Sequence, residues 1–247
     1  QQVAGELGTS SAHVTFLPQG ELSSLTEAQF LHRTDQQFHF INRGYADHEA
    51  FLAELSSSKR KNLRKERAKA QAGLTFRHVQ GEEITEEHLD IFFEFYMDTG
   101  NRKWGSPYLT RKSFSILRER MAKDLLFIFA CEGDEIIAGA MNLVGSDTLY
   151  GRYWGCTVDK PFLHFELCYY QAIEHAIRLG LPRVEAGAQG QHKIARGYLP
   201  APVYSAHFIA DPALREPVRR YLDQERAAVQ NEMDWLFEEY SPFKAGG

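Results

Sequence analysis

The chain has 247 residues, of which 43% are hydrophobic and 13% aromatic, so it is large and apolar enough to bury the core of one large or two small domains. A formal net charge of -5 excludes a protein that is basic throughout, as general binders of polyanions are. No apolar run approaches the ~18 residues of a membrane-spanning helix, and the N-terminal residues do not have the layout of a signal peptide, so we expect a cytoplasmic protein. The three cysteines lack the spacing of a zinc site, so we expect no metal.

The first half of the sequence predicts short strands that alternate with helices. In chain order, the predicted elements are strands at 13–18 and 36–42, a helix at 47–55, a basic segment at 56–72, a strand at 74–79, and helices at 85–100 and 111–121. The assignment at 85–100 depends on Leu89, Phe92 and Tyr96, whose intervals of three and four place them on one helix face.

The second half changes from helical spacing to alternation and back. The predicted elements are strands at 125–131, 135–144 and 148–156, a helix at 165–180, a strand at 183–188, a loop at 189–200, a strand at 203–210 and a helix at 212–240. The turns "EGD" and "GSD" favour an antiparallel meander of the first three strands. The whole order predicts an α+β protein with a mixed sheet, a meander flanked by helices and a closing C-terminal helix, which is the order of the GNAT acyltransferase fold.

Three segments resemble the FemAB-like, or Fem-type, branch of the GNAT superfamily. They are "SSKRKNLRKERAKAQAG", "FYMDTGNRKWGSPYLT" and "GAQGQHKIARGYLP". Fem enzymes carry a basic helix that opens the second of two tandem GNAT-like domains, and Lys61, Arg64 and Lys65 occupy comparable places. They also carry a Phe-Lys-x-x-Phe-Gly loop, and the segment 192–198 looks like its counterpart. The resemblance covers about residues 30–240.

The resemblance implies a domain organisation and a class of reaction. Residues 1–50 would be the remnant of a truncated first GNAT-like domain, and 51–247 the second, with the basic helix at 56–72. Its function would be acyl or aminoacyl transfer to an amine of a phosphate-bearing or cell-wall-precursor-like substrate. Acyl-CoA and aminoacyl-tRNA both remain open as donors, because the place of the glycine-rich CoA loop reads "TVDKPFLHFE", without glycines. tRNA is therefore a possible partner, and the oligomeric state stays open.

The basic segment is a candidate anion site. It holds seven basic side chains and one acid between Lys59 and Lys69, a local net charge of +6. On a helix, Arg60 and Arg64 share one face and Lys65 lies on the neighbouring face, so the three could grip a phosphate of the substrate. The alternative is a solvated helix face without a ligand.

The loop that follows the strand at 183–188 gathers the strongest candidates for catalysis. Acylation of an amine needs a group that takes a proton and a donor for the developing oxyanion. His192 or Glu185 could take the proton, and Lys193 or a backbone N–H could stabilise the oxyanion. Candidate substrate contacts in the same loop are Gln189, Arg196 and Tyr198. The alternative is that the cations pair with surface carboxylates and His192 is an ordinary loop residue.

Two further substrate contacts are predicted outside this loop. Trp154 lies on the strand beside which a GNAT acyl group would sit, and it could line a pocket or pack in the core. Arg102 follows the end of a helix, where a cation could bind substrate or complement the helix dipole.

Two classes of function follow from these residues. The first is a GNAT-type acyl or aminoacyl transferase, which would depend on Lys193 or His192. The second is a non-catalytic GNAT-like module that binds a phosphorylated ligand or RNA through the basic helix, with an affinity that falls steeply with salt.

Overall fold

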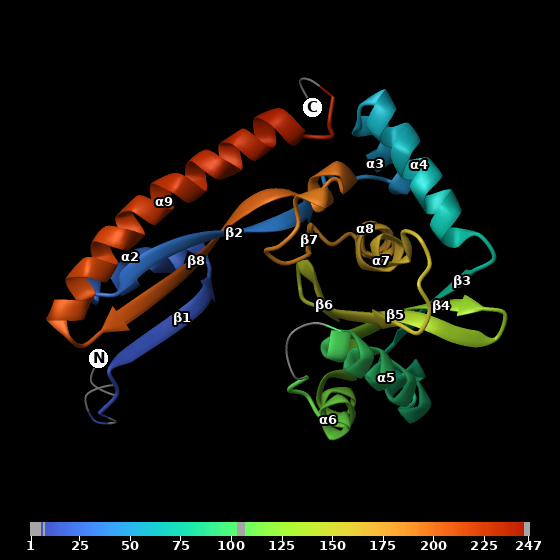
Figure 1. Cartoon of the computed structure of the whole chain (residues 1–247), viewed down its shortest axis with the longest axis horizontal. Helices are drawn as coiled ribbons and strands as arrows, with labels where there is room; N and C mark the ends of the chain where they lie inside the picture. The colour runs from blue at the N-terminus through green and yellow to red at the C-terminus, as the bar shows by residue number, and fades with distance from the viewer. Residues whose placement is uncertain (1–5, 7, 103–106, 245–247) are drawn as a thin grey trace. The chain divides into compact units, whose positions relative to one another are not determined.

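The structure of the protein is a computed structural model that describes Glu6 and residues 8–102 and 107–244. Its strands are β1 (Ser11–Leu17), β2 (Leu31–Ile41), β3 (Thr75–Gln80), β4 (Leu125–Glu132), β5 (Glu135–Val144), β6 (Thr148–Cys156), β7 (Arg183–Glu185) and β8 (Leu199–Ile209). Its α-helices are α2 (Leu22–Glu27), α3 (His48–Glu54), α4 (Ser57–Gln71), α5 (Glu86–Arg102), α6 (Arg111–Met121), α7 (Leu163–Phe165), α8 (Gln171–Leu179) and α9 (Pro212–Tyr240) (Figure 1).

The strands form a mixed sheet in the order β1-β8-β2-β7-β6-β5-β4-β3. Strands β3, β4, β5 and β6 pair antiparallel in that order. The short turns predict this pairing for β4 to β6, whereas β3 is joined to β4 through α5 and α6. Strand β7 joins β6 in parallel and pairs antiparallel with β2. The predicted fold class is confirmed: a mixed α/β structure of the GNAT type, with a meander flanked by helices and a closing C-terminal helix.

The chain divides into two compact units, one formed by residues 1–38 and 199–241 and the other by 39–198 and 242–247. The first unit therefore joins segments from both ends of the chain, whereas the sequence predicts one boundary at residue 50. That residues 1–50 are the remnant of another domain stays a prediction. Within the first unit, β1 and β8 pair antiparallel, and Arg33 of β2 donates two hydrogen bonds of 2.8 and 2.9 Å to Glu225 of α9.

The second unit carries helices on both faces of its strands. Helices α5 and α6 cover one face of β4 to β6, and α7 and α8 lie on the other face (Figure 1). The core beneath α5 is rich in aromatic rings, among them Phe92, Phe114 and Phe127, which meet edge to face. The basic segment forms α4. The helix before it, α3, has Asp47 as its N-cap, and the Asp47 carboxylate accepts a hydrogen bond from Ala50 N at 2.8 Å.

Helix α2 is not predicted from the sequence, and β2 begins at Leu31 instead of residue 36. Two further differences concern the type of helix. The helix predicted at 165–180 is not uniform, because Glu166–Tyr170 form a π-helical turn between α7 and α8. The loop predicted at 189–200 contains a 3₁₀ helix at Gln191–Arg196. A π-helical turn is wider and a 3₁₀ turn tighter than an α-helical turn, and the spacing of apolar residues does not reveal either difference. In the part of the chain that the structure describes, no helix is both long and apolar enough to cross a membrane.

Candidate functional site

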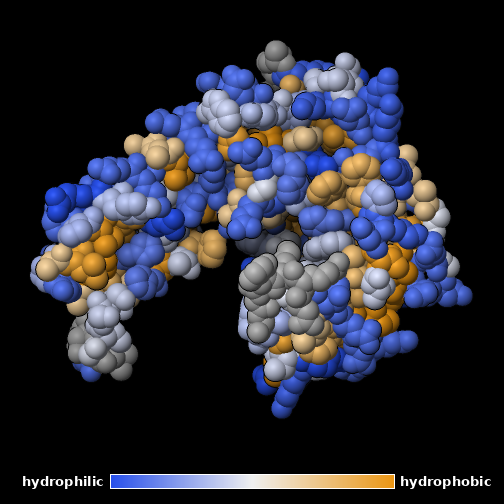
Figure 2. Space-filling model, viewed as in Figure 1, coloured by the Kyte–Doolittle hydropathy of each residue, from blue (hydrophilic) through white to orange (hydrophobic). Residues whose placement is uncertain are grey.

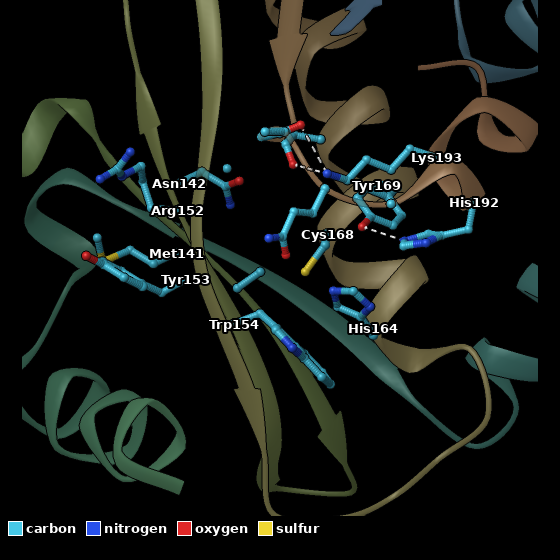
Figure 3. A pocket seen from close by; sticks show the side chains of 17 residues that line it. Met141, Asn142, Arg152, Tyr153, Trp154, His164, Cys168, Tyr169, His192 and Lys193 are labelled. Atoms are coloured by element: carbon cyan, nitrogen blue, oxygen red, sulfur yellow. Dashed lines mark hydrogen bonds between the residues drawn. The ribbon is translucent and has the colours of Figure 1, made fainter. Parts of the chain in front are cut away.

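A cavity of about 750 Å³ opens where β6 and β7 diverge (Figure 3). The two strands are paired in parallel only from Thr148 to Tyr150 and from Arg183 to Glu185. Beyond these pairs, residues 151–154 of β6 form one wall and residues 186–190 form the other. The π-helical turn supplies a third wall through Cys168 and Tyr169. Because the two parallel strands separate beyond these pairs, backbone and side-chain groups of both are accessible to a ligand in the space between them.

A β-bulge shapes the strand side of the cavity. Met141 pairs with Tyr153 and Asn142 with Gly151, so Arg152 is an extra residue without a partner in β5. Arg152 is exposed and lines the cavity. Asn142 is 1% exposed, and its Nδ2 has no hydrogen-bond acceptor among the described residues. Because buried amides are almost always paired, this donor marks the wall as a place for a ligand oxygen.

Lys193 brings a buried positive charge to the opposite side of the cavity. Its side chain is 4% exposed, and Nζ donates hydrogen bonds to Ala186 O at 2.6 Å and Gly187 O at 3.1 Å (Figure 3). Burial lowers the pKa of Lys193 to about 8, so the ammonium form prevails at neutral pH. The same two carbonyls belong to the wall after β7, so the lysine also fixes the shape of that wall.

His192 lies beside Lys193 at the mouth of the cavity. Its Nε2 is 3.1 Å from the hydroxyl of Tyr169, and its ring packs against Phe165. Burial, followed by the charges of Arg196 and Lys193, lowers the pKa of His192, which favours the neutral ring. Gly190 precedes it with φ at +102°, and a Cβ on Gly190 would overlap the His192 imidazole. Glycine is therefore required at this position for the observed histidine conformation.

Arg196 does not line the cavity; its side chain contacts α4 and the backbone of the loop that carries His192. It is 7% exposed, donates two hydrogen bonds to Glu66 of α4, and stacks over Phe165 with its guanidinium 3.6 Å from the ring centre. Its Nη1 also donates to His192 O at 2.6 Å. Tyr198 is fully buried and donates to Tyr169 O at 3.1 Å. Both residues hold the catalytic candidates in place.

The other predicted residues of this region lie at different distances from the cavity. Gln189 and Trp154 line it, and the indole of Trp154 packs against His164 with ring centres 4.6 Å apart. Glu185 ends β7 but does not line the cavity, and its carboxylate lies 3.3 Å from Arg183 Nε. Burial raises the pKa of Glu185. Arg102 ends α5, and its side chain lies outside the described residues.

The predicted anion site on α4 divides into separate parts. Arg60 donates to the carbonyls of Ala53 and Leu55, and Arg64 pairs with Glu49. Lys65 is exposed, and Figure 2 shows a mainly hydrophilic surface over α4. None of the three lines the cavity between β6 and β7. The structure therefore does not bring the helix cations and the loop candidates together.

Several cavity residues were missed by sequence reasoning. They are Asn142, His164, Cys168 and Tyr169. Asn142 left a signal, because it is the one amide within the apolar strand "EIIAGAMNLV". Arg152 lies near Trp154 in the predicted strand at 148–156, but simple alternation does not reveal the bulge that it forms. The described residues that line the cavity include two cations, Arg152 and Lys193, and no Asp or Glu, so the cavity suits an anionic or carbonyl-bearing ligand. In the described ranges, no group of three or more His, Cys, Asp or Glu side chains is arranged to hold a metal ion.

The meander, the parallel strand that diverges from it and the cavity at their junction define a GNAT-like protein. The chain belongs to the FemAB-like family, described as peptidoglycan biosynthesis/recognition, whose model matches residues 1–245. The predicted family resemblance is confirmed.

Three solved structures share the fold at low sequence identity. The C-terminal domain of a protein described as a lysylphosphatidylglycerol synthetase, from Agrobacterium fabrum, is 13% identical with a TM-score of 0.61, over 87% of this chain and 72% of that one. L-PGS from Bacillus licheniformis is 14% identical with a TM-score of 0.61, over 90% and 75%. FemX is 11% identical with a TM-score of 0.62, over 88% and 76%. No curated protein sequence matches the chain.

Proposed function

We propose that the protein transfers an acyl or aminoacyl group to an amine of a phosphate-bearing or cell-wall-precursor-like substrate, in the cavity between β6 and β7. The observation that carries this proposal is that one cavity is lined both by Lys193, a buried ammonium, and by Asn142, whose Nδ2 has no partner among the described residues. The family description supports a substrate from peptidoglycan biosynthesis. Structures named for lysylphosphatidylglycerol synthesis share the fold, so an aminoacyl group stands beside an acyl group as the group transferred.

The residues of the cavity can be given roles in such a transfer. The amine lone pair attacks the donor carbonyl carbon, the C=O electron pair moves to oxygen, and the bond to the leaving group then breaks as the carbonyl reforms. The charge of Lys193 and the N–H of Asn142 stabilise the oxyanion. His192, held neutral by its lowered pKa, accepts the proton that the amine loses. Glu185 lies away from the cavity and is the less suitable base.

The charge of the cavity supports a ligand with an anionic group. Arg152 on the bulge and Lys193 on the loop are not balanced by any carboxylate among the described lining residues. A phosphate or carboxylate near the reacting carbonyl would pair with Arg152, which can bind either group through two N–H donors. Acyl-CoA and aminoacyl-tRNA, the two donors considered, both carry phosphates.

A thermal-shift comparison tests the proposal, because a ligand that binds only the folded state raises the melting temperature. Acetyl-CoA, a UDP-linked cell-wall precursor and bulk tRNA are compared at low and moderate salt. We expect a salt-tolerant shift with one of them, lost in Lys193→Met and retained in Lys61→Met, a lysine of α4 outside the cavity. That ligand is then used in a transfer assay with an amine acceptor. A shift that survives Lys193→Met, or a bound donor that never transfers, would reject the site.

A second function is favoured by one observation on α4. Lys59, Lys61 and Lys65 have no ion-pair partner in the described part of the chain, although the arginines of the same helix are engaged. These lysines support a non-catalytic module that binds RNA or another polyanion. The melting temperature of such a module would rise only with tRNA, and its affinity for tRNA would fall steeply with salt. Lys61→Met would weaken tRNA binding more than Lys193→Met.

A further inference from the structure

A second cavity, of about 870 Å³, lies among the start of α3, strand β3 and helix α8, and it shares no lining residue with the first. Its lining residues are Ala46, Asp47, His48, Phe76, His78, Gln171, Glu174, His175, Ile177 and Arg178. Most of them carry hydrogen-bonding side chains, which is unusual for a wall that contains buried positions. The transfer proposed above uses none of them.

The wall of this cavity is organised by Arg67 of α4, whose side chain is 12% exposed. Its guanidinium donates to both carboxylate oxygens of Glu166, at 3.0 and 2.8 Å, and to both of Glu174, at 2.9 and 3.0 Å. Glu166 is fully buried and also accepts from Gln171 Nε2 at 2.8 Å. Because the amide nitrogen of Gln171 donates to Glu166, its amide oxygen faces His78. His78 Nε2 lies 2.9 Å from this oxygen and donates to it.

Arginine donors also determine the tautomers of the two most buried histidines in this wall. Arg67 Nη1 lies 3.2 Å from His48 Nδ1, and Arg178 Nη2 lies 2.7 Å from His175 Nδ1. An arginine can only donate, so each Nδ1 holds a lone pair and each neutral ring carries its proton on Nε2. Burial is the main reason that the pKa of His48 and that of His175 fall to about 4, which keeps both rings neutral at pH 7.

The two Nε2–H groups that result are buried donors without an acceptor. His48 is 8% and His175 is 3% exposed, and neither Nε2 has a hydrogen-bond partner among the described residues. Buried donors are paired in the great majority of folded proteins, with protein, water or ligand. Two such donors in the wall of one cavity therefore indicate a missing oxygen acceptor. Arg178, exposed at the edge of the cavity, adds a positive charge and makes a carboxylate the acceptor that fits best.

Negative charges in the same cavity fit the other end of a dipolar ligand. Asp47 is exposed, and among the described residues its Oδ1 accepts from Ala50 N. Glu174 is partly exposed, and its carboxylate has acceptor positions beyond the two that Arg67 uses. These groups attract an ammonium and disfavour a phosphate dianion. A metal ion does not fit, because Arg67 donates to Nδ1 of His48 and Arg178 to Nδ1 of His175, which leaves a proton and no lone pair on each Nε2.

We propose that this cavity binds a free amino acid. Its carboxylate would lie toward Arg178 and the Nε2–H donors of His48 and His175, and its ammonium toward Asp47 and Glu174. The site is separate from the cavity between β6 and β7, and the proposal does not rest on the transfer reaction.

An NMR titration of the full chain labelled with ¹⁵N-histidine tests this binding. Before any addition, His48 and His175 should give the ring signals of neutral Nε2–H tautomers at pH 7. Each of the common amino acids is then added, and acetate, methylamine and inorganic phosphate are added separately at matched ionic strength. We expect at least one amino acid to shift both ring signals in a saturable way, with a Kd at least about tenfold lower than that of acetate or methylamine.

Two arginine variants show whether the response belongs to this cavity. Arg178→Gln removes the charge but keeps a donor for His175, and it should weaken binding at least about tenfold. Arg77→Gln is the matched control, because Arg77 precedes His78 and points to the other side of β3, and it should bind as the unmodified chain does. Saturable shifts with acetate or phosphate that equal those of every amino acid would replace the proposal by a simple anion site. No saturable shift with any amino acid, or unchanged binding by Arg178→Gln, would overturn it and leave water as the only occupant.

Discussion

Arg196 and Glu66, 130 positions apart in the sequence, are joined by two parallel hydrogen bonds of 2.9 and 2.8 Å. The pair connects the 3₁₀ helix that carries Lys193 to the basic helix α4. Tyr170 of the π-helical turn donates to the same carboxylate at 2.7 Å, so three elements meet at Glu66. The one acid of the basic segment thus joins that helix to two elements that line the cavity.

Replacing Glu66 should destabilise the protein far more than breaking an exposed ion pair. Glu66→Gln leaves the Arg196 charge buried without its partner, which typically costs ~3–5 kcal/mol. Arg64→Ala breaks the neighbouring pair with Glu49, whose side chains are 54% and 64% exposed, and such pairs contribute ~0–1 kcal/mol. Urea unfolding of the two variants measures the difference in the free energy of unfolding. Equal, small losses would show that Arg196 finds other partners or solvent.

Stability should fall between pH 6.5 and pH 4 because of three buried histidines. Burial is the main cause that lowers the pKa of His39, His48 and His175 from 6.5 to about 4. The unfolded chain therefore takes up protons before the folded chain does, and the stabilisation is complete above pH 6.5 and is lost as the pH falls through about 4. Each pKa unit corresponds to ~1.4 kcal/mol, which is large against a total stability of ~5–15 kcal/mol.

Urea unfolding at pH 7.5, 5.5 and 4.5 measures this dependence. The upper part of the window, from 6.5 to 5, lies above the titration of ordinary carboxyl groups and isolates the histidines. His48→Gln should make the slope shallower there, because one group that binds a proton only in the unfolded chain is gone. An unchanged slope would mean that His48 is protonated in the folded protein as readily as in the unfolded one.

The order of the elements could be predicted from the sequence because it is a local property. The apolar alternation of 125–131, 135–144 and 148–156 and the helical spacing of 85–100 are each visible within a short window. The π-helical turn at Glu166–Tyr170 could not, since the apolar spacing of a single widened turn differs little from that of an α-helix.

The candidate site could be predicted only where its residues are neighbours in sequence. Lys193 and His192 follow a strand within one polar loop, so a local pattern finds them. Other residues of the site come from elsewhere: Asn142 of β5 lines the same cavity, and Glu66 of α4 accepts the hydrogen bonds of Arg196. Arg196 looks like a substrate cation in the loop sequence, and its pairing with Glu66 depends on a tertiary contact that no short window contains.

Lys193 should give the transfer reaction an alkaline limb. If its ammonium stabilises the oxyanion, the rate falls as the pH rises through its pKa of about 8 and the charge is lost. Lys193→Met keeps the length of the side chain without the charge and should lower kcat by ~10²–10³, the loss typical of one oxyanion donor. The measurement is kcat/KM against pH with the donor identified by the thermal-shift comparison. Lys61→Met is the control and should keep both rate and limb, whereas an alkaline limb that persists in Lys193→Met would assign it to another group.

A methyl group at Gly190 should act through His192. The backbone there has φ at +102°, and the added Cβ would overlap the imidazole, so Gly190→Ala combines backbone strain with displacement of the ring. We expect slower transfer and a loss of stability of ~1–3 kcal/mol, measured by urea unfolding. His192→Ala removes the ring, so adding Gly190→Ala in that background should cost only the strain, and the difference between the two costs is the energy of the clash. If Gly190→Ala costs the same with and without His192, the glycine serves the backbone alone and the ring is not held in place by it.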